Sequence, residues 1–542
     1  MRTAAALMRG EWLGEWGSQP VPHITLAKGP GYAIFLASTH WTGVAPQNIS
    51  YALYLLGALL LVLGLKRHTG AGVAVALYAL LAWNQVAFAG DLSRIYRDQL
   101  VAAVALLSLG LAVQLANALA GRREAAGPRQ RRMRPWALAI LLGAALGWLL
   151  ITRSDVVWVI TTAVLVVIMG AAPTIWRSKG WAVPLSSLAL VGMVAALPTL
   201  GVVAMNQHTY QVALLDDYSQ GAFADSVKSW SSVPGGEDFL VVSDDQREAV
   251  YAVSSTARLL EPFLEAPGNW WVAHGCSFQT DTYVPCDEFG GSFSWALRDA
   301  AMATGEIRTA AEFQQFFQRL DDEIVTACSS QVLACGARAI SPDVPSLDRI
   351  SRRTFVAGFA GYAAGSLSGG ANAWSQAGPP SSSSDSLEMW LTTVNGSRQT
   401  LDLVESGQHQ AILTQRNIVQ ALASIYGWWL IPALLLSIVA LFTRALWTSF
   451  VGQVALACFM GWGMNLAIVA LFHAGTNKFG GSGLIVYTMS SQSFFLLGTA
   501  LAALVAAQAG WQNRLAVPSS VTAIRDRHSA QHRNRDDGRP VS

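Results

Sequence analysis

Three short stretches of the chain concentrate the charged side chains that could do chemistry: residues 11–28, 91–98 and 151–155. Their carboxylates suit a general base or ligands of a divalent metal ion. These carboxylates are Glu11, Glu15, Asp91, Asp98 and Asp155. Their cations suit a phosphate group. These cations are Lys28, Arg94, Arg97 and Arg153. If the three stretches converge in the fold, they form one polar pocket.

Lys28 opens the sequence Lys28-Gly-Pro-Gly-Tyr32, which we call the KGPGY turn. Two glycines and a proline leave the backbone exposed in a tight turn, where amide groups can face an anion such as a phosphate. We therefore count Tyr32 with Lys28 among the candidate phosphate-binding residues. Two plainer interpretations stay open. The segment can be an ordinary loop broken by turn residues, and Arg97–Asp98 and Arg153–Asp155 can be salt bridges that anchor helix ends.

The chain that carries these residues has the composition of a membrane protein. Of 542 residues, 52% are hydrophobic and only 13% are charged, and the mean hydropathy is +0.36. A net charge of +2 is too small to indicate nucleic acid. Apolar stretches with the length of a bilayer crossing occur at roughly 49–65, 71–89, 99–119, 136–151, 156–175, 183–203, 424–442, 448–472 and 483–508. We expect an α-helical polytopic protein of the cytoplasmic (inner) membrane with about nine transmembrane helices.

Basic residues fix the expected orientation, because they cluster in every second loop and in the tail, which are then cytoplasmic. The other loops, including all three charged stretches, are then outside. The sequence predicts an extracytoplasmic loop with the KGPGY turn, a six-helix transmembrane region, an extracytoplasmic mainly helical domain, a three-helix transmembrane region and a basic cytoplasmic tail. Their bounds are 1–48, 49–203, 204–423, 424–508 and 509–542.

The polar region 204–423 is long enough for a domain with its own core. Apolar residues recur at helical spacing over 248–264 and 310–324. Four cysteines lie in this region, and two disulfides are the economical interpretation, although three connectivities are possible. The simplest pairs are Cys276 with Cys286 and Cys328 with Cys335. The rival is a zinc site, for which the spacings are poor.

Three runs of sequence resemble a known family. They are GEWLGEWGSQPVPHITLAKGPGYAIFLASTHWTG, DLSRIYRDQL and LGWLLITRSDVVWVI, at 10–43, 91–100 and 146–160. They look like membrane-embedded glycosyltransferases of multi-span GT-C-type architecture (family 39-like), the class that includes protein O-mannosyltransferases and lipid A aminoarabinose transferases. The KGPGY turn stands where that family has a Pro-Pro turn, and Arg97-Asp98 and the segment 152–155 match its later Arg-acid elements. The similarity covers the spans to 203 and the domain to about 340.

The resemblance implies transfer of a sugar from a polyprenyl-phosphate carrier to an extracytoplasmic acceptor, which would be a glycan, a lipid or a protein. Lys28, Arg97 and Arg153 would face the phosphate, and Asp98 and Asp155 would hold a metal ion, orient an arginine or accept an acceptor hydroxyl. No cofactor is implied, and a divalent metal ion is left open. Membrane lipids are the remaining expected partners, and nucleic acid is not expected.

One element of the family pattern has no counterpart. The family has an acidic pair and a span ahead of the position of Ala6, whereas residues 1–5 contain no carboxylate. We therefore expect either a further span and acidic pair upstream of Met1 or a chain that has lost its base, for which Glu11 and Glu15 could substitute. The alternative from another class is a non-catalytic membrane assembly or envelope-binding protein that acts through its outer domain. In that protein the charges would pair only locally.

Overall fold

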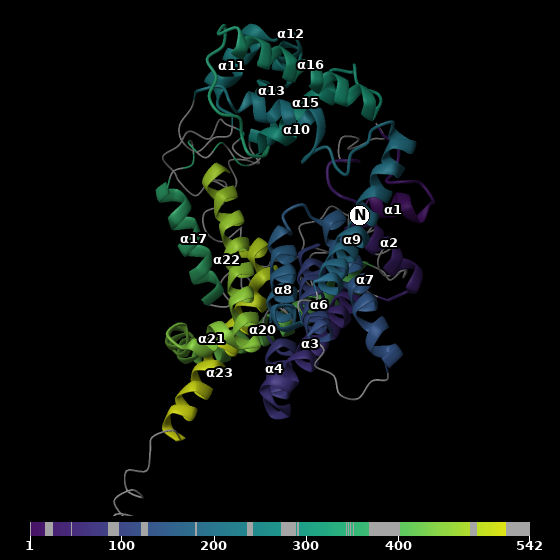
Figure 1. Ribbon diagram of the computed structural model, residues 1–542. Coiled ribbons are helices and arrows are strands. Elements are labelled where there is room, and N and C mark those ends of the chain that lie inside the picture. The colour runs from purple at the N-terminus through teal and green to yellow at the C-terminus, as the bar shows by residue number, and fades with distance from the viewer. Residues whose placement is uncertain are drawn as a thin grey trace, which may run out of the picture.

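The computed structural model describes residues 2–16, 25–44, 46–84, 97–120, 128–178, 181–235, 242–272, 289, 292–342, 344, 346, 348, 350, 352–367, 401–476 and 485–515. Within these residues the regular secondary structure is helical, apart from one isolated bridge between Ser341 and Val344. Figure 1 shows a bundle of long helices with a group of shorter helices, which we call the globular domain, at one end. His23, Asp91, Arg94, Cys276 and Cys286 lie outside the described residues.

Long helices form the bundle, and each predicted span overlaps one of them. They are α3 (Pro46–Thr69), α4 (Ala71–Ala82), α6 (Arg97–Leu119), α7 (Pro128–Thr152), α8 (Val157–Ser178), α9 (Ala182–Tyr210), α20 (Leu401–Leu441), α22 (Phe450–Thr476) and α23 (Ile485–Leu515). Seven helices of the described part are long and apolar enough to cross a membrane, and the apolar stretches of α4 and α8 are shorter. The predicted class, an α-helical polytopic membrane protein, is confirmed. That the protein has nine transmembrane helices stays a prediction.

Glycines allow the helices of the bundle to approach closely. A Cβ atom on Gly57 of α3 would lie 2.5 Å from the backbone nitrogen of Leu107 on α6, and one on Gly110 of α6 would lie 2.6 Å from the carbonyl oxygen of Gly57. Small residues at such crossings bring two backbones into van der Waals contact, which drives helix association in lipid. Helix α6 is the most enclosed span, with 89% of its apolar window buried, whereas α9 has 17% buried.

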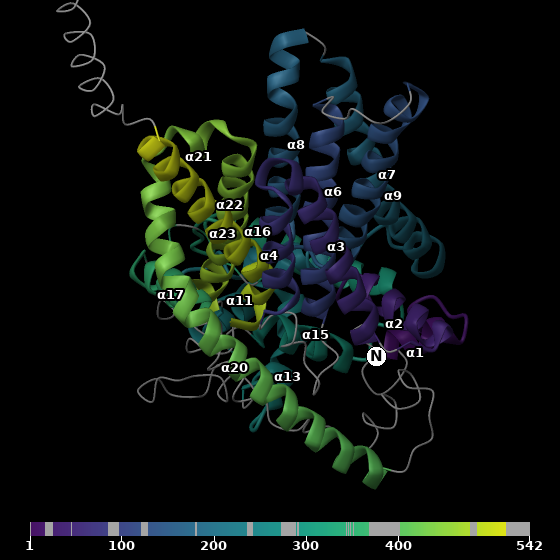
Figure 2. The ribbon, with the colours of Figure 1, turned by 90° about the horizontal axis from the view of Figure 1, so that it is seen from below.

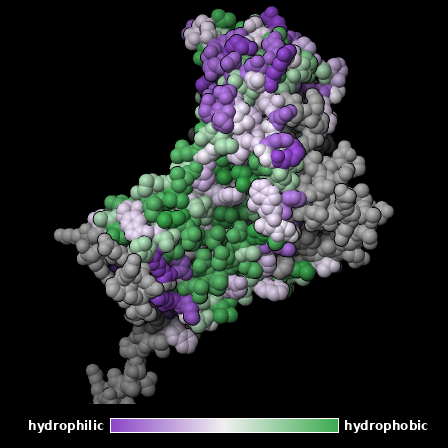
Figure 3. Space-filling model, turned by 90° about the vertical axis from the view of Figure 1, so that its right-hand side faces the viewer, coloured by the Kyte–Doolittle hydropathy of each residue, from purple (hydrophilic) through white to green (hydrophobic). Residues whose placement is uncertain are grey.

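The outer surface of the bundle is apolar. Figure 3 shows a broad hydrophobic zone below the hydrophilic globular domain. On α20, which Figure 2 shows along its whole 41-residue length, exposed side chains include Ile425, Trp428, Ile431 and Leu435. Exposed apolar surface of this extent on helices of membrane-crossing length is what hydrocarbon solvates.

The globular domain is built from α10 (Gly221–Trp230), α11 (Asp244–Val253), α12 (Ser255–Arg258), α13 (Glu261–Leu264), α15 (Phe293–Ala303) and α16 (Ala310–Ser329). The predicted helix at 310–324 is α16, and its aromatic face lies in the domain core. The single helix predicted for 248–264 was wrong, because Ser254 has an extended backbone and its side chain caps the next helix by accepting the N–H of Ala257. Because Ser254 is the N-cap of α12, its backbone is not helical, and the chain is interrupted between α11 and α12.

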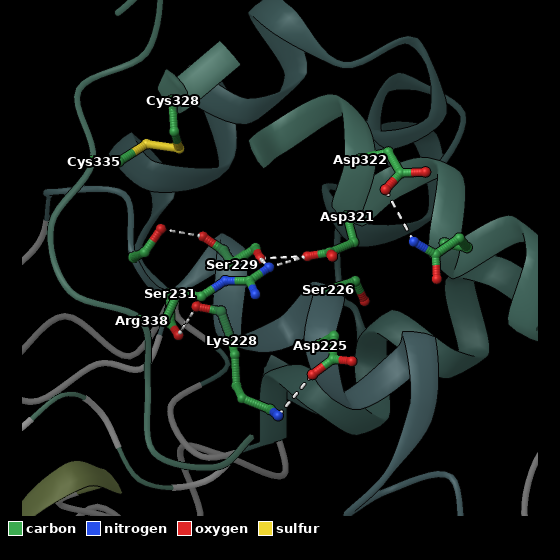
Figure 4. A network of polar contacts seen from close by, with 12 residues as sticks. Asp225, Ser226, Lys228, Ser229, Ser231, Asp321, Asp322, Cys328, Cys335 and Arg338 are labelled. Atoms are coloured by element: carbon green, nitrogen blue, oxygen red, sulfur yellow. Dashed lines mark hydrogen bonds and ion pairs between the residues drawn. A yellow bond between two sulfur atoms is a disulfide. The ribbon is translucent and has the colours of Figure 1, made fainter. Parts of the chain in front are cut away.

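The segment after α16 is fastened to the domain by a disulfide and an ion pair (Figure 4). The predicted pairing of Cys328 with Cys335 is confirmed. Beyond it, Arg338 donates a 2.6 Å hydrogen bond to Asp321 of α16 and also contacts Ser229 of α10. Both contacts hold residues 333–339 against the domain. Cys458 of α22 is a buried free cysteine in the core of the bundle, as expected for a small apolar side chain.

Candidate functional site

The KGPGY turn lies directly on the end of α7. A Cβ atom on Gly29 would collide with the carbonyl oxygen of Ile151, and one on Gly31 would lie 2.9 Å from the backbone nitrogen of Thr152. Since a real Cβ does not approach backbone atoms this closely, only glycine fits at the two positions. Helix α2 (Gly31–Thr42) starts from this turn. The turn therefore lies next to Arg153, which directly follows Ile151 and Thr152 and is the cation of the cluster described below.

An ion cluster occupies the point where α6 begins and α7 ends. The guanidinium group of Arg153, directly after α7, pairs with Asp98 in the first turn of α6 and with Asp155 in the connection to α8. The hydrogen bond from Nη2 of Arg153 to Oδ2 of Asp155 is 2.6 Å long. The structure thus brings together Asp98, Arg153 and Asp155, which come from two of the three charged stretches.

Burial makes this cluster electrostatically strong. The side chains of Asp98 and Arg153 are 2% and 5% exposed, whereas that of Asp155 is 25% exposed and can meet a solute. Two carboxylates around one guanidinium leave a formal excess of one negative charge, part of which the N-terminal end of α6 stabilises at Asp98. Within the described residues, the Oδ2 atom of Asp98 is buried without a hydrogen-bond partner. That oxygen is available as an acceptor.

Lys28 points from the KGPGY turn to an aromatic group of the globular domain. Its Nζ atom lies 5.3 Å from the ring centroid of Trp295 on α15, which is within the range of a cation–π contact. Tyr218 stacks on Trp295 with centroids 5.3 Å apart, and Trp271 lies nearly parallel to it at 6.3 Å. We call Tyr218, Trp271 and Trp295 the aromatic stack. It places flat apolar rings next to a solvent-exposed ammonium group.

The globular domain is joined to this end of the bundle through the same segment. The backbone N–H of Asp217 donates a 2.9 Å hydrogen bond to the carbonyl oxygen of Leu26, two residues before Lys28. The carboxylate of Asp217 in turn accepts two hydrogen bonds from Arg298 of α15, of 2.5 and 3.1 Å, and both side chains are fully buried. The guanidinium carbon of Arg298 lies 4.8 Å from the ring centroid of Phe223. Burial raises the pKa of the neighbouring Asp216.

The carboxylates of loop one lie at the surface instead. Glu11 is exposed and accepts hydrogen bonds of 2.8 and 3.1 Å from Arg9, which lower the pKa of Glu11. Glu15 is also exposed. The loop is fixed by Trp12, whose indole N–H donates a 2.8 Å hydrogen bond to Asn206 of α9. An exposed carboxylate with a depressed pKa, such as that of Glu11, is a weak general base.

The remaining predicted residues lie at helix starts. Tyr32 is in the first turn of α2 and stacks on Phe35 with centroids 6.0 Å apart, so its ring packs along its own helix. Arg97 is the first residue of α6 and is partly exposed beside Asp98. The described residues contain no group of three or more His, Cys, Asp or Glu side chains that could hold a metal ion.

Sequence reasoning missed the aromatic stack and the pair of Asp217 with Arg298. The only signal in the sequence was the aromatic run around 289–295, in which Trp295 is followed after one residue by a Leu-Arg-Asp triplet. Helical spacing in α15 places Trp295 and Arg298 on neighbouring parts of one face. Which face meets Lys28 depends on tertiary packing.

Comparisons with protein-family models, with curated proteins and with solved structures find no match. The fold and the ion cluster therefore define the class only, an α-helical polytopic membrane protein with a helical globular domain over one end of its bundle.

Proposed function

We propose that this chain is a membrane glycosyltransferase, which moves a sugar from a polyprenyl-phosphate carrier to an acceptor on the side of the membrane that bears the globular domain. The positions of the basic loops in the sequence support an extracytoplasmic location of that side. We place the protein in the cytoplasmic membrane as part of the proposal. The observation that carries the proposal is the meeting of Asp98, Arg153 and Asp155 beneath the KGPGY turn. Transfer of a sugar from a lipid-linked phosphate needs a base for the acceptor hydroxyl and fixed cations for the leaving phosphate.

The geometry suggests how the roles are divided. Asp155 is the member of the cluster that a substrate can reach, so it serves as the base that takes the proton of the acceptor hydroxyl. The acceptor oxygen then forms a bond to the anomeric carbon while the bond from that carbon to the phosphate oxygen breaks. The carrier phosphate leaves with its electron pair, and Lys28 meets its negative charge. Asp98 is buried and orients Arg153.

The aromatic stack supports a carbohydrate substrate. Rings of Tyr218, Trp271 and Trp295 offer an apolar face with polar edges next to the ammonium group of Lys28. Pyranose rings have apolar C–H faces that pack on such surfaces while their hydroxyl groups remain hydrogen-bonded.

The test is transfer by the full-length protein in membranes, with radiolabelled polyprenyl-phosphate-linked mannose and aminoarabinose as donors. We expect Asp155→Asn to lower the transfer rate by about 100-fold or more, as for loss of a general base. Lys28→Ala should abolish transfer. Glu11→Gln is the matched control, since this carboxylate is exposed and pairs only locally with Arg9 in the described structure, and it should leave the rate unchanged. Intact transfer by Lys28→Ala would contradict the proposal.

One observation favours the alternative, a non-catalytic membrane protein that binds an envelope component. Both carboxylates of the cluster are engaged by Arg153, as in a salt bridge that anchors helix ends. Such a protein would transfer no sugar from either donor, and Asp155→Asn would change only its thermal stability. Measurement of stability beside transfer in the same variants separates the two functions.

A further inference from the structure

Helix α17 (Arg352–Leu367) packs on α22 and α23 of the membrane bundle, although the sequence analysis assigns residues 204–423 to the globular domain. Tyr362 of α17 is buried in a cluster with Leu466, Val469 and Ala470 of α22. Figure 1 shows α17 alongside α22. After its first two residues, Arg352 and Arg353, the helix contains no further charged side chain and is mostly apolar.

The C-terminal end of α17 lies deep in the bundle. Its Ser366 accepts a 3.2 Å hydrogen bond at Oγ from the indole N–H of Trp462, and its carbonyl oxygen accepts a 2.7 Å bond from Gln492 of α23. Trp462 lies near the middle of Phe450–Phe472, the part of α22 whose described residues are long and apolar enough to cross a membrane. It is twelve residues from Phe450, which is about 18 Å at 1.5 Å per helical residue, in a hydrocarbon core of about 30 Å.

Polar side chains of α22 and α23 bind the last described turn of α17. Within hydrocarbon, a polar group needs a hydrogen-bond partner from neighbouring protein. Gln492 supplies one to the carbonyl oxygen of Ser366 and Trp462 supplies one to its hydroxyl group, and all three side chains are buried or partly buried. Gln492 would be an expensive residue on a span if it faced lipid.

The opposite face of α17 is apolar and exposed. Val356 and Leu367 are 54% and 43% exposed, and Ala357, Ala360 and Ala364 between them are also exposed. This face lies beside α22, one of the helices that are long and apolar enough to cross a membrane. It extends the apolar outer surface of the bundle. Arg352 and Arg353 stand at its shallow end, where lipid phosphates attract arginines.

We propose that α17 lies in the bilayer, which it enters from the side of the globular domain, and that its Ser366 reaches mid-depth beside Trp462 and Gln492. Its exposed face, from Val356 to Leu367, is a surface for lipid acyl chains. Arg352 and Arg353 contact the lipid headgroups. This inference concerns the membrane insertion of residues 352–367 and does not depend on the proposed transfer activity.

The test uses the unmodified full chain in vesicles of phosphatidylethanolamine and phosphatidylglycerol, with a carbene photoprobe that partitions into acyl chains and readout of labelled residues by mass spectrometry. We expect labelling at Val356, Ala360 and Leu367 as strong as at Leu197 of α9, which is 61% exposed. It should be several-fold above labelling at Val332, which is 71% exposed but belongs to the globular domain. Equal labelling at Val356 and Val332 would overturn the proposal.

Water-borne hydroxyl radicals give the complementary measurement on the same vesicles. They should modify Val332 and spare Val356. If neither reagent reaches Val356, a second protein surface covers this face, and the proposal is wrong. A substitution adds a third readout: Ala360→Asp should lower the recovery of folded protein, because a carboxylate at that depth is costly, whereas Ala252→Asp, at an exposed alanine of the globular domain, should not.

Discussion

The backbone N–H of Asp217 donates a hydrogen bond to the carbonyl oxygen of Leu26, which joins the globular domain to the segment that ends in the KGPGY turn. The same turn lies on Ile151 and Thr152 of α7. Residues 26–31 are therefore packed between the domain and the bundle, and the position of Lys28 depends on both. The stability of this junction can be measured.

The buried pair of Asp217 and Arg298 should be essential for the globular domain. Arg298→Ala leaves a buried carboxylate without its cation, so we expect a loss of about 3–5 kcal/mol in the free energy of unfolding. Thermal unfolding followed by tryptophan fluorescence in detergent measures it. Arg319→Ala is the control, since Arg319 is exposed over Phe316 and should cost less than about 1 kcal/mol. An equal effect of both variants would show that the pair has no special role.

Gly31→Ala should displace the KGPGY turn from α7. The added Cβ would lie 2.9 Å from two backbone atoms of residues 151 and 152, which cannot rotate away as a side chain could. We expect a destabilisation of about 1–3 kcal/mol, as for overpacking of a well-packed site. Gly192→Ala on α9 is the matched control, since a Cβ atom at that position would meet nothing within 4 Å. Unchanged stability of Gly31→Ala would mean that the turn does not rest on α7.

The disulfide should be visible directly in the mass of one peptide. Cys328 and Cys335 lie in the same tryptic fragment, 320–338, which without reduction should weigh two hydrogen masses less than after reduction. Replacement of both cysteines by serine should lower the free energy of unfolding by about 2 kcal/mol, because a short loop is no longer closed in the unfolded chain. Full reactivity of both thiols in the folded, unreduced protein would contradict this pairing.

The globular domain should lose stability in acid through Glu265. Burial alone would raise the pKa of Glu265, but hydrogen bonds from Arg247, of 2.8 and 3.0 Å, and from Tyr251 hold it below its ordinary value of 4.5. A carboxylate with a lowered folded-state pKa stabilises the fold above its unfolded pKa and loses this contribution as the pH falls through the folded value. Unfolding measured below pH 4.5 should therefore depend less on pH in Glu265→Gln. An unchanged pH dependence would exclude this carboxylate as a source of acid sensitivity.

The sequence predicted the membrane helices well because each span is defined by a sum over some twenty side chains, which one substitution hardly changes. It placed Asp98 and Arg153 on the same side of the membrane by the alternation of basic loops, and the structure shows that these side chains meet. Their roles in a reaction stay a prediction. Helix α17 was missed because its 16 residues are too few for a full span and its alanines and glycines give weak hydropathy.

Other features depend on contacts between distant segments. The face of α15 that meets Lys28 is set by packing of the whole domain, and no local pattern in residues 293–303 indicates it. The break at Ser254 was hidden by apolar residues that keep helical spacing across it. Glu11 and Glu15 were candidates because loop one is polar, but they face solvent.

The enclosure of α6 limits how anything can approach Asp98. Helices α3, α7, α8 and α23 pack around α6, and its apolar window is almost entirely covered. Asp98 lies in the first turn of α6, and its side chain is only 2% exposed. Asp155 is the most exposed member of the cluster, with 25% of its side chain accessible, whereas Arg153 is 5% exposed. Within the described residues, solvent therefore meets this cluster at Asp155.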